Sequence, residues 1–256
     1  MHVTHWGRSG PRVVLVHGGA QGTSTAGEAN FRGQEILGEQ GWQLIVPDRP
    51  GHGRSPDPGR PDDAEADGAL IAGLLGEGAH LVGHSFGGAV ALAAAAQKPA
   101  SVKSLTVIEP AMQSFAIRDW RVKRMLLRMV AAMAFSRSPA KKARRIMKVL
   151  GTPPELQNNA TEAELIRMGE AIGRARLPNK ATLALQLTGM KVARIPFLVV
   201  SGGWGLGVEA TCDIVASAGG GERAVVPCEH HFPQWNSEAF NAVLARFMAR
   251  VEGKTK

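Results

Sequence analysis

The stretch from His80 to Gly88 reads His-Leu-Val-Gly-His-Ser-Phe-Gly-Gly, and it indicates how the rest of the chain folds. A short apolar run comes before the glycines, and an alanine-rich run from Ala89 to Gln97 follows them at once. This order predicts a strand, a sharp turn and a helix. The turn would strain the backbone of Ser85, and a side chain at Gly83 or Gly87 would collide with the neighbouring strand or helix. The glycines therefore allow the Ser85 hydroxyl to project above the edge of a sheet.

Length and composition describe a globular protein without an export or disulfide signal. The chain has 256 residues, of which 44% are apolar and 20% charged, as in one large domain or one domain with an insert. No apolar run approaches the roughly 18 residues of a membrane span, and the first residues resemble no signal or transit peptide. Cys212 and Cys228 are too few for a disulfide framework and lack metal-site spacing. We therefore expect a cytoplasmic protein without a metal or a membrane partner.

The positive charge is concentrated in one segment. The net charge is +8, but residues 111–192 alone hold 16 Lys and Arg against 5 Asp and Glu, and the remainder is slightly acidic. Such a segment could attract an anionic substrate or an acidic partner, or could form an ordinary solvated helical face. Neither zinc-finger spacing nor an RNA-binding motif accompanies the charge, so we expect no nucleic acid partner.

Strands and helices alternate along most of the chain. Apolar or β-branched runs predict strands at His2–Trp6, Arg12–His17, Trp42–Val46, His80–His84, Ser104–Glu109, Pro196–Ser201 and Arg223–Val226. Helical spacing predicts helices at Asn30–Gln40, Ala89–Gln97, Val208–Ala216 and Asn236–Val251. It also predicts a helix that is capped by Asp62 or Asp63 and carries Ala69, Leu70, Ile71, Leu74 and Leu75. From about residue 111 to 191 the chain has no convincing strand, and helices are predicted at Arg118–Phe135, Pro139–Leu150, Thr161–Arg174 and Lys180–Met190. This order predicts an α/β fold with a mostly parallel, doubly wound sheet and an inserted all-helical segment.

The residues that could carry chemistry fall at the carboxyl ends of the predicted strands, where parallel sheets bind ligands. They are Gly18-Gly19, Asp48, Ser85, Glu109, Gly202-Gly203 and His231. Their concurrence at one edge of the sheet favours a single functional site.

Four motifs in this order resemble the α/β-hydrolase superfamily. They are His17-Gly18-Gly19, the loop Asp48–Ser55, the G-x-S-x-G nucleophile elbow with a further glycine at 83–88, and His230-His231-Phe232-Pro233. The resemblance implies a hydrolase core at residues 1–110 and 192–256. It also implies a helical cap at 111–191, inserted after the strand that ends at Glu109.

The resemblance also implies a catalytic triad. Ser85 is the expected nucleophile, and His231 is preferred to His230 as its general base because the family pattern is similar to His-Phe-Pro. Many relatives carry the orienting acid after the seventh strand of the family sheet, where this chain reads Ser-Gly-Gly-Trp-Gly-Leu-Gly without a carboxylate. Some capped relatives carry it after the sixth, the place that Glu109 occupies. The alternatives, on the following helix, are Glu209 and Asp213.

The remaining site predictions concern the oxyanion hole and the pocket. The N–H of Phe86 should supply one oxyanion donor and that of Gly19 the other, with Ala20 as the alternative. We expect Asp48 and Arg49 to brace their loop by hydrogen bonds. The expected pocket residues are Trp120, Trp204, His84 and Ala20.

These residues together imply acyl transfer to water without a cofactor or metal. We expect a monomer or homodimer that acts on a small-molecule substrate, a small to medium apolar ester or lactone. A serine at 85 argues against dehalogenation and epoxide opening, for which relatives use an Asp nucleophile. Carbon–carbon bond hydrolysis of a diketone, ligand sensing with little turnover and docking of an acidic partner through the basic segment are the alternatives.

Overall fold

The computed structural model describes residues 1–21 and 26–253, so residues 22–25 and 254–256 of the expected core ranges lie outside the described part. A seven-stranded sheet has the order β1-β3-β2-β4-β5-β6-β7. β1 pairs antiparallel with β3, and the other neighbouring pairs are parallel, which confirms the expected mostly parallel sheet. The strands are β1 (Val3–Trp6), β2 (Arg12–Val16), β3 (Gln43–Pro47), β4 (Ala79–His84), β5 (Val102–Ile108), β6 (Phe197–Ser201) and β7 (Glu222–Val225).

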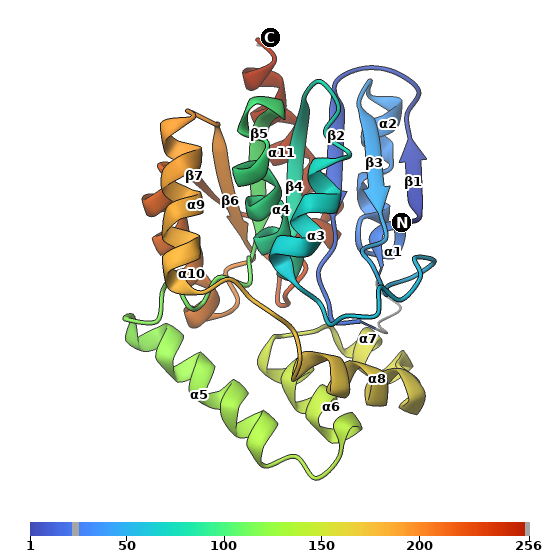
Figure 1. Ribbon diagram of the computed structural model, residues 1–256, viewed down its shortest axis with the longest axis vertical. Coiled ribbons are helices and arrows are strands. Elements are labelled where there is room, and N and C mark those ends of the chain that lie inside the picture. The colour runs from blue at the N-terminus through green and yellow to red at the C-terminus, as the bar shows by residue number, and fades with distance from the viewer. Residues whose placement is uncertain (22–25, 254–256) are drawn as a thin grey trace.

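Helices cover both faces of this sheet (Figure 1). The helices of the core are α1 (Gly27–Asn30), α2 (Ile36–Glu39), α3 (Ala64–Ala72), α4 (Phe86–Gln97), α9 (Lys180–Val192), α10 (Leu206–Gly219) and α11 (Ser237–Val251). Four more, α5 (Trp120–Ala134), α6 (Pro139–Val149), α7 (Pro154–Asn159) and α8 (Glu162–Ile172), follow β5, and short 3₁₀ turns lie at 32–34, 99–101 and 233–235. Among the described helices, none has the length and hydropathy needed to cross a lipid bilayer.

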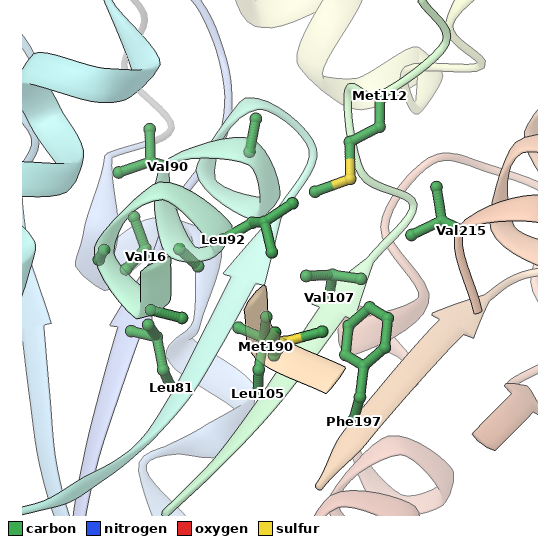
Figure 2. Close-up of a cluster of buried hydrophobic side chains, with 14 of the residues drawn as sticks. Val16, Leu81, Val90, Leu92, Leu105, Val107, Met112, Met190, Phe197 and Val215 are labelled. Carbon is green, nitrogen blue, oxygen red and sulfur yellow. The ribbon is translucent and has the colours of Figure 1, made fainter. Parts of the chain in front are cut away.

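Successive side chains of the central strands are buried on opposite faces of the sheet, as the pleat requires. In β2, Val16 belongs to the cluster formed with α3, α4, α9 and α10, whereas the preceding Leu15 packs in the cluster formed with α11. Figure 2 shows the first cluster, where Leu105 and Val107 of β5 lie near Met190 of α9. Because both faces are apolar, the central strands read as continuous apolar runs in the sequence.

The helix expected at Asn30–Gln40 is instead broken into α1, a 3₁₀ turn and α2. Glycines lower helix propensity here, and Gly33 lies so close to α11 that an added Cβ would be 2.7 Å from Ser237 Cβ. The buried Gln34 side chain also donates to the Gln234 carbonyl at 2.9 Å. These tertiary contacts determine the local backbone, which the helical spacing alone did not show.

The helices α5 to α8 lie beyond the carboxyl ends of the parallel strands (Figure 1). α6 and α8 pack on each other through Ala140, Ala143, Met147 and Leu165. The expected cap range of 111–191 also includes nearly all of α9, but Leu183, Leu187 and Met190 of α9 are buried in the core cluster against α4 and the sheet. The helices that stand outside the layered core are therefore α5 to α8, called the α5–α8 segment below.

Candidate active site

The turn between β4 and α4 holds Ser85 in an uncommon backbone conformation, with φ 54° and ψ −119°. The neighbouring glycines explain how the chain tolerates it. A Cβ on Gly83 would lie 2.3 Å from the Gly87 carbonyl oxygen, and one on Gly87 would lie 2.2 Å from that of Val16. The turn is fixed by the Ser85 N–H, which donates to the Ile108 carbonyl at 2.9 Å. The strain that the sequence predicts at this turn is therefore present.

His231 links the serine to an acid. Its Nε2 lies 2.9 Å from Ser85 Oγ, and its Nδ1 lies 2.6 Å from Glu109 Oε2. His231 is 7% exposed, and its hydrogen bond to Glu109 is buried, whereas its bond to Ser85 is partly buried. The main-chain N–H of His231 donates to the Gly151 carbonyl at 2.9 Å, which attaches the histidine loop to the turn after α6. This line of contacts has the geometry of a nucleophile, a base and an orienting acid.

Glu109 directly follows β5 and is 1% exposed, with a positive φ of 42°. Besides His231, its carboxylate accepts hydrogen bonds from the Gly202 N–H at 2.8 Å and from Trp204 Nε1 at 3.0 Å. Each oxygen of this buried carboxylate therefore has hydrogen-bond partners, as a buried polar group requires. The structure thus brings Ser85, His231 and Glu109 together.

The two alternative acids have other partners. Glu209 contacts Arg223 at 2.8 Å and accepts from the Ser201 hydroxyl at 2.8 Å. Asp213 pairs with the same Arg223 at 2.9 Å and is more than half exposed. Neither forms an ion pair or hydrogen bond with His231 among the described contacts, so both belong to an ion-pair cluster around Arg223.

Trp204 has a role that the sequence did not show. It was expected in the pocket wall, but its indole N–H donates to both carboxylate oxygens of Glu109 at 3.0 Å. Gly151 lies against the ring: a Cβ there would be 2.6 Å from it, and the φ of +61° also favours glycine. Trp204, Gly202 and Cys228 also line an open hollow of about 530 Å³. The glycine-flanked tryptophan was the available signal, but its partner is 95 positions away.

His84 contacts the loop that carries His231. Burial and the nearby His231 lower the pKa of His84 well below its usual value, so the ring is neutral. In the tautomer that fits its neighbours, Nε2–H donates to the His231 carbonyl at 2.7 Å, while Nδ1 accepts from Asn30 at 3.3 Å. His84 is 1% exposed and its ring contacts Phe232. It thus holds the loop of His231 in place.

Arg49 is fully buried beneath the glycine-rich loop after β2. Its guanidinium donates to the carbonyls of His17 and Gly19, both at 3.0 Å, and lies 4.7 Å from the centre of the Phe86 ring. Because the carbonyls are held on the Arg49 side, the loop is fixed at the place where Gly19 and Ala20 were expected to supply an amide donor. Phe86 is the first residue of α4, and the N-cap residue before it, Ser85, makes no side-chain capping hydrogen bond.

The charge of Arg49 is balanced by buried carboxylates. Its Nη1 contacts Asp62 at 2.8 Å and Asp67 at 2.9 Å, and all three side chains are at most 1% exposed. Asp48 accepts from the N–H groups of Gly27 and Arg54 at 3.0 and 2.9 Å. Asp48 and Arg49 therefore make bracing hydrogen bonds of the kind that the sequence predicts for their loop.

Two further histidines beside Arg49 are neutral. Burial, and then the charge of Arg49, lower the pKa of His17 well below its usual value and the pKa of His52 to about 2. His17 Nε2 accepts from the Arg49 main-chain N–H at 2.9 Å, so its proton is on Nδ1, which donates to the Gly18 carbonyl at 2.7 Å. Both rings are structural parts of the loop.

Trp120 lies away from these contacts. It begins α5, its side chain is 63% exposed, and it takes part in none of the ring contacts around His231. Over the described residues, no group of three or more His, Cys, Asp and Glu side chains is arranged to hold a metal ion.

The chain belongs to the α/β hydrolase fold family, because the model of that family matches residues 11–149, more than half of the chain. The matched range contains Ser85 and Glu109.

The relatives fall within the same fold. Lipase LipV of Mycobacterium tuberculosis is 35% identical over 170 residues, which are 64% of this chain and 60% of that lipase. A hydrolase from Pseudomonas aeruginosa has a TM-score of 0.69 at 20% identity, with 96% of this chain and 93% of that one covered. A structure from a study of carboxylesterases of Nitrososphaera gargenis has a TM-score of 0.69 at 13% identity, with 99% and 96% covered. These structures share the fold at low identity.

Proposed function

We propose that the protein is a serine hydrolase that cleaves an ester or lactone of a small to medium apolar substrate. The observation that carries the proposal is the hydrogen-bonded line from Ser85 Oγ through His231 to Glu109, with distances of 2.9 and 2.6 Å. A serine is a weak nucleophile by itself and needs a base that is in turn oriented by a third group. The three residues supply those roles.

In the acylation step, Ser85 Oγ attacks the substrate carbonyl carbon as its proton passes to His231 Nε2. The tetrahedral intermediate collapses when the C–O bond to the leaving alkoxide breaks and His231 returns the proton to that oxygen. A lactone gives the same acyl-enzyme, except that the released hydroxyl stays attached to the acyl chain. No redox change or cofactor enters this sequence.

The negative charge of the intermediate would be held by the N–H of Phe86 and by an N–H of the Gly19–Ala20 loop. The Phe86 amide is at the first turn of α4, where helical N–H groups have no partner within the helix. Arg49 holds the loop by its carbonyls, at 3.0 Å from Gly19. Donors fixed before the reaction need no reorganisation when the charge develops.

In the deacylation step, a water molecule loses its proton to His231 Nε2 and attacks the acyl carbon, and Ser85 leaves with that proton. Glu109 keeps the Nδ1 proton on His231 directed toward the carboxylate, so that Nε2 can accept. The carboxylate also stabilises the imidazolium that forms in each half-reaction. Trp204 and Gly202 in turn hold Glu109.

We assign the α5–α8 segment the role of a cap over this site. This assignment is supported by the position of these helices beyond the strand ends and by the contacts of Gly151 with Trp204 and His231. The missing carboxylate after β6 favours ligand sensing without turnover, and the contact of Glu109 with His231 argues against that alternative.

The first test is labelling with a small fluorophosphonate, read by intact mass, of the wild type beside Ser85→Ala and His231→Ala. We expect the wild type alone to gain one phosphonyl group rapidly, because only its serine is activated. A panel of esters, lactones and diketones then separates acyl transfer from carbon–carbon bond hydrolysis. A folded wild type that is not labelled would refute the proposal. Turnover of diketones alone would mean that the reaction is carbon–carbon bond hydrolysis rather than ester cleavage.

A further inference from the structure

The outer side of α5 exposes large apolar side chains. Trp120, Leu127 and Val130 are 63%, 69% and 59% exposed, and Phe135, directly after the helix, is 75% exposed. Spacings of seven and eight residues place Trp120, Leu127 and Phe135 along one side of the helix. The opposite side of α5 is buried through Val122 and other residues. The helix is therefore apolar on two sides, and only one of them is used inside the molecule.

Basic side chains surround this apolar stripe. From Trp120 to Val149 the chain contains ten Lys and Arg and no Asp or Glu. In the part of the chain that the structure describes, only Arg121 and Arg144 of these ten form ion pairs, with Asp119 and Glu162. Exposed basic residues of α5 and α6 outside those pairs are Lys123, Arg124, Arg128, Lys141, Arg145 and Lys148.

An open hollow lies between α5 and α6, next to the stripe. Its volume is about 350 Å³, and it is lined by Arg128, Arg145 and Lys148 together with apolar residues that include Phe135. A hollow with cationic walls and an apolar rim suits an anionic head group whose chain continues into an apolar phase. We call the stripe, its flanking cations and this hollow the outer α5–α6 face.

We propose that the outer α5–α6 face docks on an anionic lipid surface. Exposed Trp, Leu and Phe flanked by Lys and Arg are the combination that binds at the boundary between head groups and acyl chains. A second copy of the chain fits less well, because the same face would bring two sets of uncompensated cations together. An acidic protein would match the cations but would leave the exposed apolar stripe unexplained.

This docking is peripheral and needs no spanning helix. The sequence predicts no membrane partner because no apolar run is long enough to cross a bilayer. That argument does not apply to a protein that lies on the surface of a bilayer. The α5–α8 segment stands beyond the same strand ends that carry Ser85 (Figure 1). Docking would therefore turn the active-site side of the molecule toward the lipid.

The test is flotation of the full chain with vesicles of phosphatidylcholine, with and without phosphatidylglycerol, at low and high salt. We expect binding to the vesicles that contain phosphatidylglycerol and a decrease of binding at high salt. Arg124→Glu with Arg128→Glu should weaken that binding by about tenfold or more, because each cation near the surface contributes to the attraction. Leu127→Ser with Phe135→Ser should weaken it at high salt as well, where the apolar contribution remains.

Matched controls lie elsewhere on the surface. Leu185 of α9 is as exposed as Phe135, at 75%, and Lys98 and Lys191 are exposed outside the face. Leu185→Ser and the pair Lys98→Glu with Lys191→Glu should bind like the wild type. Equal binding by all variants, or no binding to anionic vesicles, would overturn the proposal. Retention on polyglutamate without vesicle binding would overturn the proposal and identify an acidic protein as the partner of this face. A dimer that Phe135→Ser abolishes would overturn it and identify a second copy of the chain as the partner. None of these readouts depends on the proposed hydrolase activity.

Discussion

Arg49 and Arg128 have the same side chain in opposite surroundings. Arg49 is fully buried and its guanidinium contacts two carboxylates and the carbonyls of the loop beside Ser85. Arg128 lies on the exposed side of α5 and forms no ion pair among the described contacts, in a stretch that contains no acid. Charge at the sheet edge is thus balanced inside the molecule, whereas charge on the α5–α8 segment is left for something outside it.

This difference separates two kinds of constraint. At the sheet edge, the Arg49 guanidinium and its carboxylate partners are buried, so removing one of them would leave a buried charge and should cost stability. On the outer α5–α6 face, a substitution should change binding and little else. Four predictions test this contrast, three at the sheet edge and one on α5.

The largest effect is expected for Glu109→Gln. The amide is neutral and can present its NH₂ to His231 Nδ1, which disfavours the tautomer that accepts from Ser85, so kcat should fall by about 10⁴-fold. Steady-state kinetics on the ester found in the substrate panel measures it. Glu155→Gln, on the exposed side of α7, is the matched control and should leave kcat unchanged. Activity of Glu109→Gln within a few fold of wild type would move the orienting role to Glu209 or Asp213.

Acid should destabilise the sheet edge. The pKa values of His17 and His84 are lowered well below 6.5 and that of His52 to about 2, chiefly by burial. Below pH 6.5 the unfolded chain takes up protons that these folded rings do not, so stability is lost as the pH falls.

Three such rings should together remove about 4 kcal/mol of unfolding free energy between pH 7 and pH 5.5. Urea denaturation at several pH values measures the loss, and His52→Asn should reduce it by about one third. A free energy of unfolding that stays constant over this range would mean that the folded rings are protonated.

Arg49→Met should lower the free energy of unfolding by about 3 kcal/mol, because it leaves Asp62 buried with its main cation removed. Asp67 retains Arg60 at 2.6 Å, which limits the loss. Denaturant titration gives the value. A change below about 1 kcal/mol would show that water or a shifted side chain replaces the guanidinium.

The smallest effect is expected for Arg128→Met, the same substitution on the exposed helix. Its free energy of unfolding should stay within about 0.5 kcal/mol of wild type, since no buried group loses a partner. The same denaturant titration compares it with Arg49→Met. A loss as large as that of Arg49→Met would mean that Arg128 has a structural partner in solution, and the contrast between the two regions would fail.

The sheet and the turn at Ser85 could be predicted because their signals are local. Strands buried on both faces need continuous apolar runs, and a turn that leaves no room for Cβ needs glycine at 83 and 87. The placement of Asp48 and Arg49 in a braced loop follows from a second local signal, the Pro and Gly content of residues 47–53. Glu109 was suggested by its position after a strand rather than by its partners.

Contacts between distant segments could not be predicted in this way. Trp204 and Glu109 are 95 positions apart, and the sequence around either residue does not indicate that the other is its partner. The spacing of apolar residues along α5 does not show which of them are buried, and Trp120, expected in the pocket as part of the lid, is 63% exposed. Likewise, α9 has the same kind of helical pattern as α5 to α8, and only its packing shows that it belongs to the core.

Gly151 limits how freely the helical insert could be exchanged between proteins of this fold. Its carbonyl accepts the N–H of His231, and its Cα leaves room for the ring of Trp204. A recombinant that received a different insert between β5 and α9 would lose both contacts, even if Ser85, His231 and Glu109 were all retained. Under the proposed role of the α5–α8 segment as a cap, an exchanged segment would have to supply an equivalent of residue 151, so a change of substrate range would depend on that turn.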